Sequence, residues 1–440
     1  MWGDVKNREN TAGSIDRYMR DLAAEEGAVR ACLKQAGEVE LKKYGFDYYF
    51  LNFLATFKDQ LPIEHLRLLA AKATVAKLWG SWEYYSYLTK LAEKRADGSG
   101  KKVTPARLKG WKLDLIRELL DHGNGLIVCS HHLGAYRYVQ TDLVFLGLKQ
   151  VLLLDREAYE QMSGGLNLAR AALGQRPDAD LALEQMLDSI DLVNVEERGA
   201  PVKILRALER GEIVLAFADG NTGLDGPLGK KSRSEIDFFG FRISVKNGIA
   251  RLSAATSCPL LPVLAVKDDK GVDQVVFSRP IIPPTESSDS AERDKFVQST
   301  MQAVYKFLEH HARSAPETWQ SSCFLHRWRA AAQQDRLSPT DISAQRTEVI
   351  RLLDLGASLR LDENRAAIVD TDGGRVLVDV KTLKLYGNIT WAEDLLKVLF
   401  DSEGLHREWM NRQGADIVRK ERYLDLLAHF KSTDLLQWAS

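Results

Sequence analysis

The segment at residues 126–137, LIVCSHHLGAYR, constrains the fold more than any other part of the sequence. Its first five residues favour a buried parallel strand that ends at His131 and His132. Gly134 then lets the chain turn into a helix whose first amides still lack partners. A histidine at such a strand end is both desolvated and reachable, as a general base near neutral pH requires. The structural alternative is that the two histidines cap the helix or fill a hydrogen-bonded niche.

A second stretch at residues 211–223, GEIVLAFADGNTG, repeats this design. An apolar run of β-forming residues ends in an acidic residue, Asp219, and continues into a glycine-rich turn with Gly220 and Asn221. Because parallel strands present their carboxyl ends at one edge of a sheet, the stretch predicts a second element of the same rim.

The composition is that of an ordinary globular protein, with 45% hydrophobic and 28% charged residues among 440. A formal net charge of −1 argues against a generally basic nucleic-acid binder. A local basic segment, KKSR at 230–233, follows the loop after the second strand, where it would meet an anionic substrate. Ordinary solvated charge explains Lys230 and Lys231 equally well.

The cysteines and the first residues bear on the compartment. The four cysteines are too few and too scattered for a disulfide framework or a zinc site: Cys32, Cys129, Cys258 and Cys323. The start, MWGDVK, lacks the features of a signal peptide, and no segment approaches the roughly eighteen apolar residues of a membrane span. We therefore expect a cytoplasmic protein without a transmembrane segment.

The order of predicted elements indicates an α/β protein with a mixed sheet flanked by helices. Residues 1–104 are predicted to form an N-terminal helical region, and strands and helices alternate over 105–330. A linker is expected at 331–344, and a β-hairpin with a few helices at 345–440 predicts a smaller α+β accessory domain. The aromatic run at 44–54 favours a core cluster, with an acyl-chain or peripheral membrane contact as the functional alternative.

Several of these segments resemble the late acyltransferases of lipid A biosynthesis, which add lauroyl or myristoyl chains and belong to the glycerolipid acyltransferase superfamily. The strand and turn at 125–136 resemble that family's strand ending in His-Phe-Gly-Asn-Trp-Glu. The other similar segments are FADGNT at 217–222, FFG at 238–240, KNG at 246–248, CPLLPV at 258–263 and the closing segment at 319–329. The resemblance covers about residues 105 to 330 and implies the fold of that family.

The resemblance assigns His132 as the general base of an acyl transfer. In the family, an acidic residue five positions after the histidine orients the imidazole; here that position holds Arg137, and counting from His131 gives Tyr136. Three interpretations remain open. Asp219 or Asp142 orients a histidine from elsewhere in the chain, with His131 sharing the work; or a good nucleophile relaxes the demand on the base while Arg137 binds an anionic group; or the domain is inactive and retained for binding.

The resemblance also implies the donor, an acyl thioester on acyl carrier protein or coenzyme A, with no bound cofactor or metal. Basic residues near the predicted rim suit the phosphate of such a donor or an acidic carrier surface: Arg137, Arg156, Lys230, Lys231, Arg233, Arg327 and Arg329. The motif residues Gly220, Asn221, Phe239 and Gly240 are the other predicted substrate contacts. Lipid A enzymes usually begin with a hydrophobic segment, so the polar start here suggests a soluble acceptor, such as a specialised metabolite or a peptide.

The C-terminal domain is faintly similar to small peptide-recognition or carrier-recognition domains of the PqqD type, on the hairpin and the segment LKLYGN at 383–388. This similarity implies an acceptor held on a peptide or a carrier protein, and a dimerisation module fits the sequence equally well. The sequence thus predicts an acyltransferase with His132, His131 and Asp219 as catalytic residues. The alternative is a catalytically inactive binding or scaffold protein on the same fold.

Overall fold

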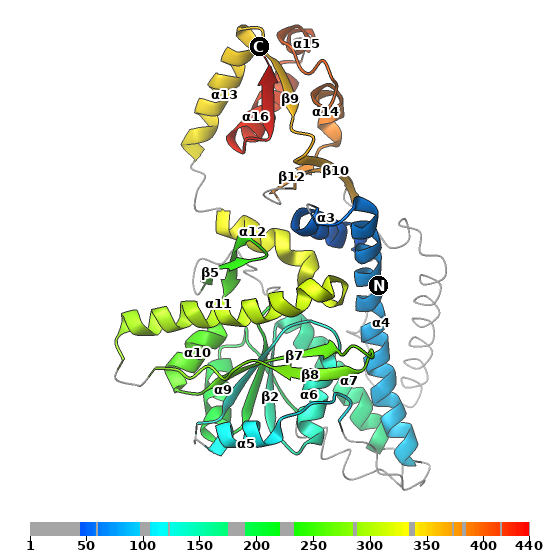
Figure 1. The fold of residues 1–440 in the computed structure, drawn as a ribbon, viewed down its shortest axis with the longest axis vertical. Coiled ribbons are helices and arrows are strands. Elements are labelled where there is room, and N and C mark those ends of the chain that lie inside the picture. Colours follow the sequence, from blue (N-terminus) through cyan, green and yellow to red (C-terminus); the bar gives the residue numbers. More distant parts are fainter. Residues whose placement is uncertain are drawn as a thin grey trace. The chain divides into compact units, whose positions relative to one another are not determined.

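The computed structural model describes residues 45–58, 60–96, 106–121, 124–174, 190–220, 233–284, 288–333, 339–371, 374–380, 384–413 and 416–439. These residues form two compact units, one within 71–322 and the other within 42–70 and 323–440 (Figure 1). The described part of the predicted N-terminal helical region consists of α3 (Phe46–Phe57) and α4 (Ile63–Ala96).

A six-stranded sheet forms the centre of the first unit, and it confirms the predicted α/β class. Five strands are parallel, and only the last strand, at one edge, runs antiparallel to its neighbour. The order across the sheet is β3 (Ile190–Asn194), β2 (Gln150–Leu154), β4 (Ile213–Phe217), β1 (Leu126–Ser130), β7 (Leu260–Lys267) and β8 (Asp273–Phe277).

Both faces of β1 are buried, as the unbroken apolar run at 126–130 requires. Leu126 and Val128 join a core cluster with side chains of α5 (Leu113–Asp121) and α6 (Arg137–Phe145). Successive strand residues point to opposite faces, so Ile127 and Cys129, also fully buried, pack on the other side. Helices α9 (Ala200–Glu209) and α10 (Gly248–Thr256) contact β4 and β1, and helices surround the sheet in Figure 1.

Residues 233–246 correct the prediction of a polar loop running into a helix at Lys246. They form a β-hairpin of β5 (Arg233–Phe238) and β6 (Phe241–Lys246), and α10 begins only at Gly248. Phe239 and Gly240 form its two-residue turn with φ of 51° and 80°, the geometry that matches the twist of a hairpin. Ser234, Ile236 and Phe238 alternate inward, which the basic composition of this stretch concealed.

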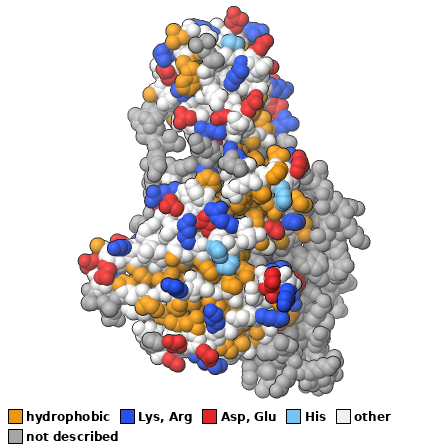
Figure 2. Space-filling view, in the orientation of Figure 1, with side chains coloured by type: hydrophobic (Ala, Val, Ile, Leu, Met, Phe, Trp, Pro, Cys, Tyr) orange, Lys and Arg blue, Asp and Glu red, His pale blue; other side chains and the backbone are white. Residues whose placement is uncertain are grey.

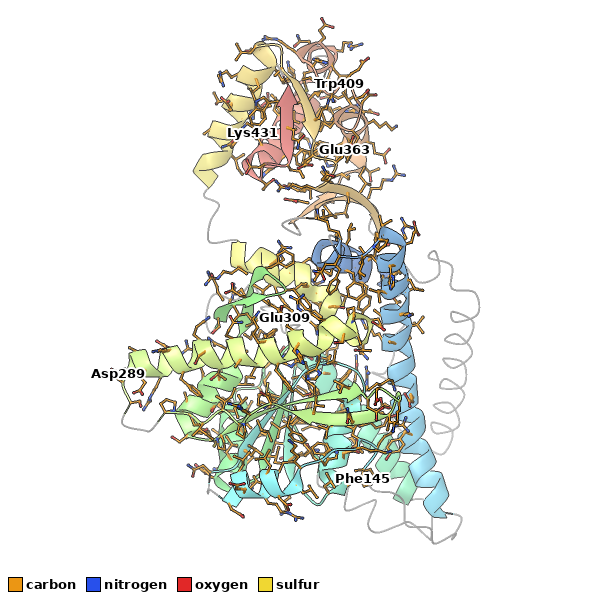
Figure 3. All side chains as sticks on the ribbon, in the orientation of Figure 1. Phe145, Asp289, Glu309, Glu363, Trp409 and Lys431 are labelled. Carbon is orange, nitrogen blue, oxygen red and sulfur yellow. The ribbon has the colours of Figure 1, made fainter. Side chains whose placement is uncertain are left out.

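Two further helices complete the first unit: α7 (Arg156–Gly174) and α11 (Ser290–Ser314). Asp289 caps the start of α11 by accepting a hydrogen bond from the amide of Glu292 at 2.8 Å (Figure 3). Helix α11 packs on β5, where Gln302 exchanges hydrogen bonds with the backbone of Asp237.

The second unit contains the predicted C-terminal hairpin with its helices. Its three-stranded sheet has the order β10 (Ala366–Thr371), β11 (Gly374–Asp379), β12 (Lys384–Asn388), all antiparallel. The helices are α12 (Leu325–Gln333), α13 (Pro339–Asp354), α14 (Glu393–Leu399), α15 (Arg407–Arg412) and α16 (Ile417–Ser432). The ends of the predicted linker at 331–344 belong to α12 and α13, and 334–338 lie outside the described residues.

The second unit ends in a strand that follows its last helix. Helix α16 ends at Ser432, and Leu436–Ala439 form β13, which pairs with β9 (Ser358–Leu361). Asp434 adopts φ of 55°, which no helix tolerates, so the chain must turn there.

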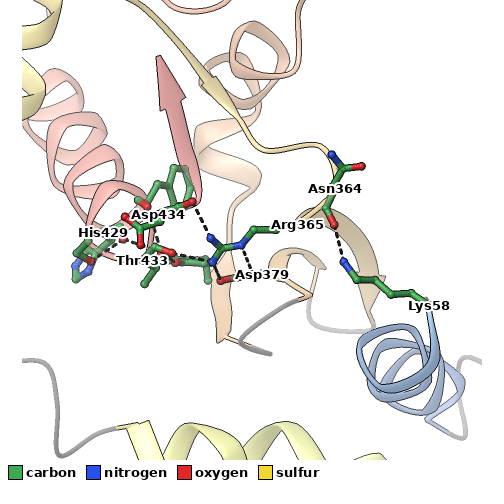
Figure 4. A network of polar contacts seen from close by, with 10 residues as sticks. Lys58, Asn364, Arg365, Asp379, His429, Thr433 and Asp434 are labelled. Atoms are coloured by element: carbon green, nitrogen blue, oxygen red, sulfur yellow. Dashed lines mark hydrogen bonds and ion pairs between the residues drawn. The ribbon is translucent and has the colours of Figure 1, made fainter. Parts of the chain in front are cut away.

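A buried ion pair links two segments of the second unit (Figure 4). The guanidinium of Arg365 donates to both carboxylate oxygens of Asp379, at 3.3 and 2.6 Å, and to the backbone carbonyls of Thr433 and Asp434. Asp379 is fully buried, and the guanidinium supplies hydrogen-bond donors to both of its oxygens.

No helix in the described part of the chain is long and apolar enough to cross a membrane. On the face drawn in Figure 2, basic and acidic side chains are interspersed, in keeping with the near-zero net charge.

Candidate active site

The candidate site lies where β1 and β4 end side by side. Ser130 is paired with Phe217 in the parallel register, and the amide of Ala218 donates to the carbonyl of Ser130 at 2.8 Å. The next residues of both strands therefore leave the sheet together, and His132 and Asp219 meet although 87 positions separate them.

His132 and Asp219 are joined by three hydrogen bonds. Nδ1 of the imidazole lies 2.8 Å from Oδ1 of the carboxylate, and the backbone amide of His132 donates to both carboxylate oxygens at 3.1 Å. Side chain and backbone of the same histidine are thus held by one acid, so ring rotation relative to the strand end is restricted.

Asp219 is fully buried, and its Oδ2 also accepts from the indole Nε1 of Trp319 at 3.0 Å. Burial by itself would raise the pKa of Asp219, but the interactions with His132, His131 and Trp319 outweigh it and hold that pKa well below its usual range. An ionised carboxylate only accepts hydrogen bonds, so Nδ1 of His132 is the donor in this contact and Nε2 is the ring nitrogen left for a reactant.

The imidazole of His132 is partly open to solvent, with 27% of the side chain exposed. Its ring packs between two aromatic rings, Tyr136 at 4.7 Å edge-on and Phe217 at 4.8 Å. The aromatic contacts fix the ring plane, while the exposure leaves part of the ring accessible to a reactant.

His131 has a different environment although it is the adjacent residue. It is fully buried, its ring meets Tyr305 edge-on at 5.2 Å, and neither ring nitrogen has a hydrogen-bond partner among the residues that the structure describes. Burial lowers the pKa of His131 to about 4, so the ring is neutral at physiological pH. The structure therefore brings His132, rather than His131, to the accessible face.

The turn after His132 is held by a distant segment of the chain. The amide of Gly134 donates to the carbonyl of Thr318 at 3.0 Å, and the amide of Gln320 donates to the carbonyl of His132 at 2.8 Å. Gly134 has φ of +57°, and a Cβ built on it would lie 2.2 Å from the carbonyl oxygen of Ala265. Only glycine fits this close approach.

Asp142, the other acid proposed to orient a histidine, is occupied elsewhere. It accepts from the backbone amides of Arg107 and Leu108, both at 2.8 Å, and from the indole of Trp111 at 3.0 Å. Asp142 therefore anchors the segment before α5, and the structure pairs Asp219 alone with His132.

Arg137, at the position where the resembling family has an acid, lies beside the dyad. Its guanidinium stacks over Tyr136 at 4.5 Å, the same ring that packs on His132. The side-chain oxygen of Gln320 accepts from Tyr136 at 3.3 Å and from Arg137 at 3.5 Å. A cation is thus held on the ring that packs against the imidazole, at the position where the resembling family has its acid.

The other predicted substrate residues are spread over several environments. Gly220 lies under the imidazole, since a Cβ there would come within 3.9 Å of Cε1 of His132. Arg156 is exposed and pairs with Glu196 at 3.6 Å, while Arg233 begins β5. Asn221, Lys230 and Lys231 lie outside the described residues.

Arg327 and Arg329 belong to the second unit. Arg327 is exposed and stacks over Phe324 at 5.2 Å. Arg329 is buried, and burial lowers its pKa to about 10.

The sequence-based reasoning gave Trp319 and Gln320 no role, although it recognised the segment that begins at Trp319. A buried tryptophan needs an acceptor for its N–H, and this requirement could have suggested that Trp319 binds a buried acid such as Asp219. Among the described residues, no group of His, Cys, Asp or Glu is arranged to hold a metal ion.

Comparison with protein families gives one match: residues 192–330 match the model for bacterial lipid A biosynthesis acyltransferase. No curated protein matches the chain. The matched range includes Asp219, Trp319 and the turn at 239–240, and it begins after His132. Residues 192–330 of this chain are thus similar to this acyltransferase family.

Proposed function

We propose that this protein is an acyltransferase that moves an acyl group from a carrier thioester to a soluble or carrier-bound nucleophile. The observation that supports this most is the 2.8 Å contact between Nδ1 of His132 and Oδ1 of the ionised Asp219. It supplies the oriented imidazole that acyl transfer requires, from a neighbouring strand rather than from the position of Arg137.

In the proposed reaction, Nε2 of His132 takes the proton from the acceptor hydroxyl or amine as the acceptor attacks the thioester carbonyl. The carbon–sulfur bond breaks when the tetrahedral intermediate collapses, and the imidazolium returns its proton to the departing thiolate. Asp219 keeps the proton on Nδ1 and stabilises the imidazolium, without becoming protonated itself.

Arg137 is the proposed anion contact of this site. The amides of Leu133 and Gly134 already donate to the carbonyls of His131 and Thr318, so they are not available to an oxyanion. The guanidinium of Arg137, stacked on Tyr136, offers donors and a positive charge beside the imidazole. We assign it to the carbonyl oxygen of the donor or to the donor phosphate.

The proposed donors are acyl carrier protein and coenzyme A thioesters, and the proposed acceptor is a specialised metabolite or a peptide in the cytoplasm. The second unit is proposed to present an acceptor that is bound to a peptide or a carrier. These assignments follow from the resemblance to the lipid A acyltransferases and, for the second unit, from its similarity to carrier-recognition domains.

The test is donor consumption, followed by intact-mass spectrometry of carrier proteins and by thioester release from coenzyme A donors of graded chain length. The wild type is compared with His132→Ala, Asp219→Asn and His131→Ala, and with His65→Ala as a control at an exposed histidine. We expect turnover by the wild type and His65→Ala, and loss of at least about 1000-fold in His132→Ala.

Wild-type turnover that survives in His132→Ala would refute the assignment of the base. No consumption of any donor by the wild type, with acceptors of the proposed classes, would favour the alternative of an inactive acyltransferase-fold protein that binds or scaffolds.

A further inference from the structure

We propose that Trp319 is a positioning residue, whose indole N–H fixes the carboxylate of Asp219 so that it can orient His132. This inference rests on the proposed function for its catalytic consequence, but the positioning itself is a property of three side chains. It extends the dyad to a chain of contacts from Trp319 through Asp219 to His132.

The two side-chain donors to Asp219 bind different oxygens, and the backbone amide of His132 donates to both oxygens. Oδ1 accepts from Nδ1 of His132 at 2.8 Å, and Oδ2 accepts from Nε1 of Trp319 at 3.0 Å. A carboxylate bound at one oxygen can rotate about its terminal torsion, whereas a carboxylate bound at both oxygens cannot do so without losing a bond. The indole is the side-chain donor to Oδ2, and together with the amide of His132 it opposes rotation of Oδ1 away from the imidazole.

The indole is itself immobile. Only 2% of Trp319 is exposed, and its rings pack edge-on against Phe238 at 5.3 Å and stack on Phe239 at 6.1 Å. Phe239 lies in the hairpin turn, and Arg313 of α11 covers its ring at 4.9 Å. Glu309, toward the C-terminal end of α11 (Figure 3), binds both Lys306 and Arg313, which keeps this helix face ordered.

The backbone around Trp319 also binds the backbone around His132. Trp319 forms an isolated antiparallel bridge with Leu133, and the flanking residues Thr318 and Gln320 bind Gly134 and His132. One segment thus fixes the acid through a side chain and the base through its main chain. The relative position of the two catalytic groups is set by a single structural element.

The chain offers a matched control. Trp111 donates from Nε1 to Oδ2 of the buried Asp142 at 3.0 Å, the same bond as that of Trp319. Asp142 contacts no histidine in the described hydrogen bonds. Loss of the Trp111 donor therefore measures the effect of removing an indole–carboxylate hydrogen bond that is not connected to His132.

The experiment measures kcat for Trp319→Phe and Trp111→Phe, alone and combined with Asp219→Asn. We expect Trp319→Phe to lower kcat roughly 10- to 100-fold, the factor for a hydrogen bond to a charged group, and Trp111→Phe to leave kcat within about twofold. In the Asp219→Asn background, Trp319→Phe should cost less than about threefold, because its partner has already changed. An equal cost in both backgrounds would show that Trp319 only packs, and the proposal would be wrong.

A second readout does not depend on turnover. In a sample with ¹⁵N-labelled histidine, the Nδ1 proton of His132 should resonate at low field, assigned by its absence in His132→Ala. We expect this resonance to shift or broaden in Trp319→Phe and to stay unchanged in Trp111→Phe. If the wild type turns over no donor but the resonance responds, the proposed function fails and the positioning holds. If His132→Ala abolishes turnover but Trp319→Phe changes neither kcat nor the resonance, the positioning fails alone.

Discussion

Asp142 and Asp219 are two fully buried carboxylates of the same unit, and each accepts a 3.0 Å hydrogen bond from an indole. Asp142 completes its set with two backbone amides at the start of the α5 region. Asp219 completes its set with the amide and the imidazole of His132. The difference is the imidazole of His132, which binds Asp219 and is itself partly exposed to solvent.

The electrostatics of the two acids follow from this difference. Burial raises the pKa of Asp142, and its backbone and indole donors only partly oppose that effect. Burial also acts on Asp219, but the histidines and Trp319 outweigh it and lower the pKa. A buried acid beside neutral donors has a raised pKa, whereas a buried acid beside two imidazoles is kept ionised, as the proposed role of Asp219 requires.

The largest effect is expected from Asp219→Asn. An amide at this position presents its own N–H to Nδ1 of His132 and favours the wrong tautomer, so kcat/KM should fall by roughly 10³- to 10⁴-fold while the fold is retained. Steady-state kinetics and circular dichroism measure the two properties. A variant with kcat/KM within tenfold of the wild type would contradict the role of Asp219.

Asp142→Ala should lower the stability of the protein but leave its turnover unchanged, the reverse of what we expect for Asp219→Asn. It leaves two backbone amides and one indole N–H without their acceptor, which should cost about 3–4 kcal/mol in the free energy of unfolding. Turnover per folded molecule should be unchanged. Urea denaturation measures the loss, with Asp289→Ala as a control that removes only an exposed helix cap, for about 1 kcal/mol. If Asp142→Ala lost turnover without losing stability, Asp142 rather than Asp219 would be the acid needed for activity.

The pH dependence of stability tests whether His131 is neutral beside Asp219. The unfolded chain takes up a proton at His131 below its ordinary pKa of about 6.5, whereas the folded chain does so only below about 4. The folded state is therefore destabilised as pH falls from about 6.5 to 4, by roughly 3 kcal/mol from this group. The free energy of unfolding of His131→Leu should fall less steeply over that range.

His326 provides the comparison for this prediction, since burial also lowers its pKa to about 4 and it lies in the second unit. In His326→Leu, the free energy of unfolding of the second unit, rather than of the first, should fall less steeply as the pH decreases. If the free energy of unfolding depends on pH identically in the wild type and in His131→Leu, His131 is already charged or solvated in the folded state.

The smallest effect is expected from Arg137→Gln. If Arg137 binds an anionic group of the donor, KM should rise about five- to tenfold, roughly 1 kcal/mol, with little change in kcat. Arg117→Gln, at an exposed arginine of α5, is the matched control. A fall in kcat with an unchanged KM would place Arg137 on the transition state instead of on donor binding.

The parallel strands and their polar ends were predictable because unbroken apolar runs such as 126–130 read directly from the sequence. The meeting of His132 with Asp219 needs β1 to lie beside β4, and this strand order depends on packing between distant segments. The sequence predicts Asp219 as a catalytic residue but leaves Asp142 open as an alternative, because the amides that occupy Asp142 come from an irregular segment with no local signal. The hairpin at 233–246 was missed because its charged outer face masks the inward alternation of Ser234, Ile236 and Phe238.

The segment that holds the two catalytic groups together has a consequence for synthesis of the chain. Trp319 follows Asp219 by 100 residues, so at about 5–20 residues per second it leaves the ribosome on the order of ten seconds later. A nascent chain that ends before Thr318 already contains the base and the acid but lacks the partner of both. Such a chain can form the sheet while its chemistry is still incomplete, and reactivity toward thioesters should therefore arise only when this last segment has docked.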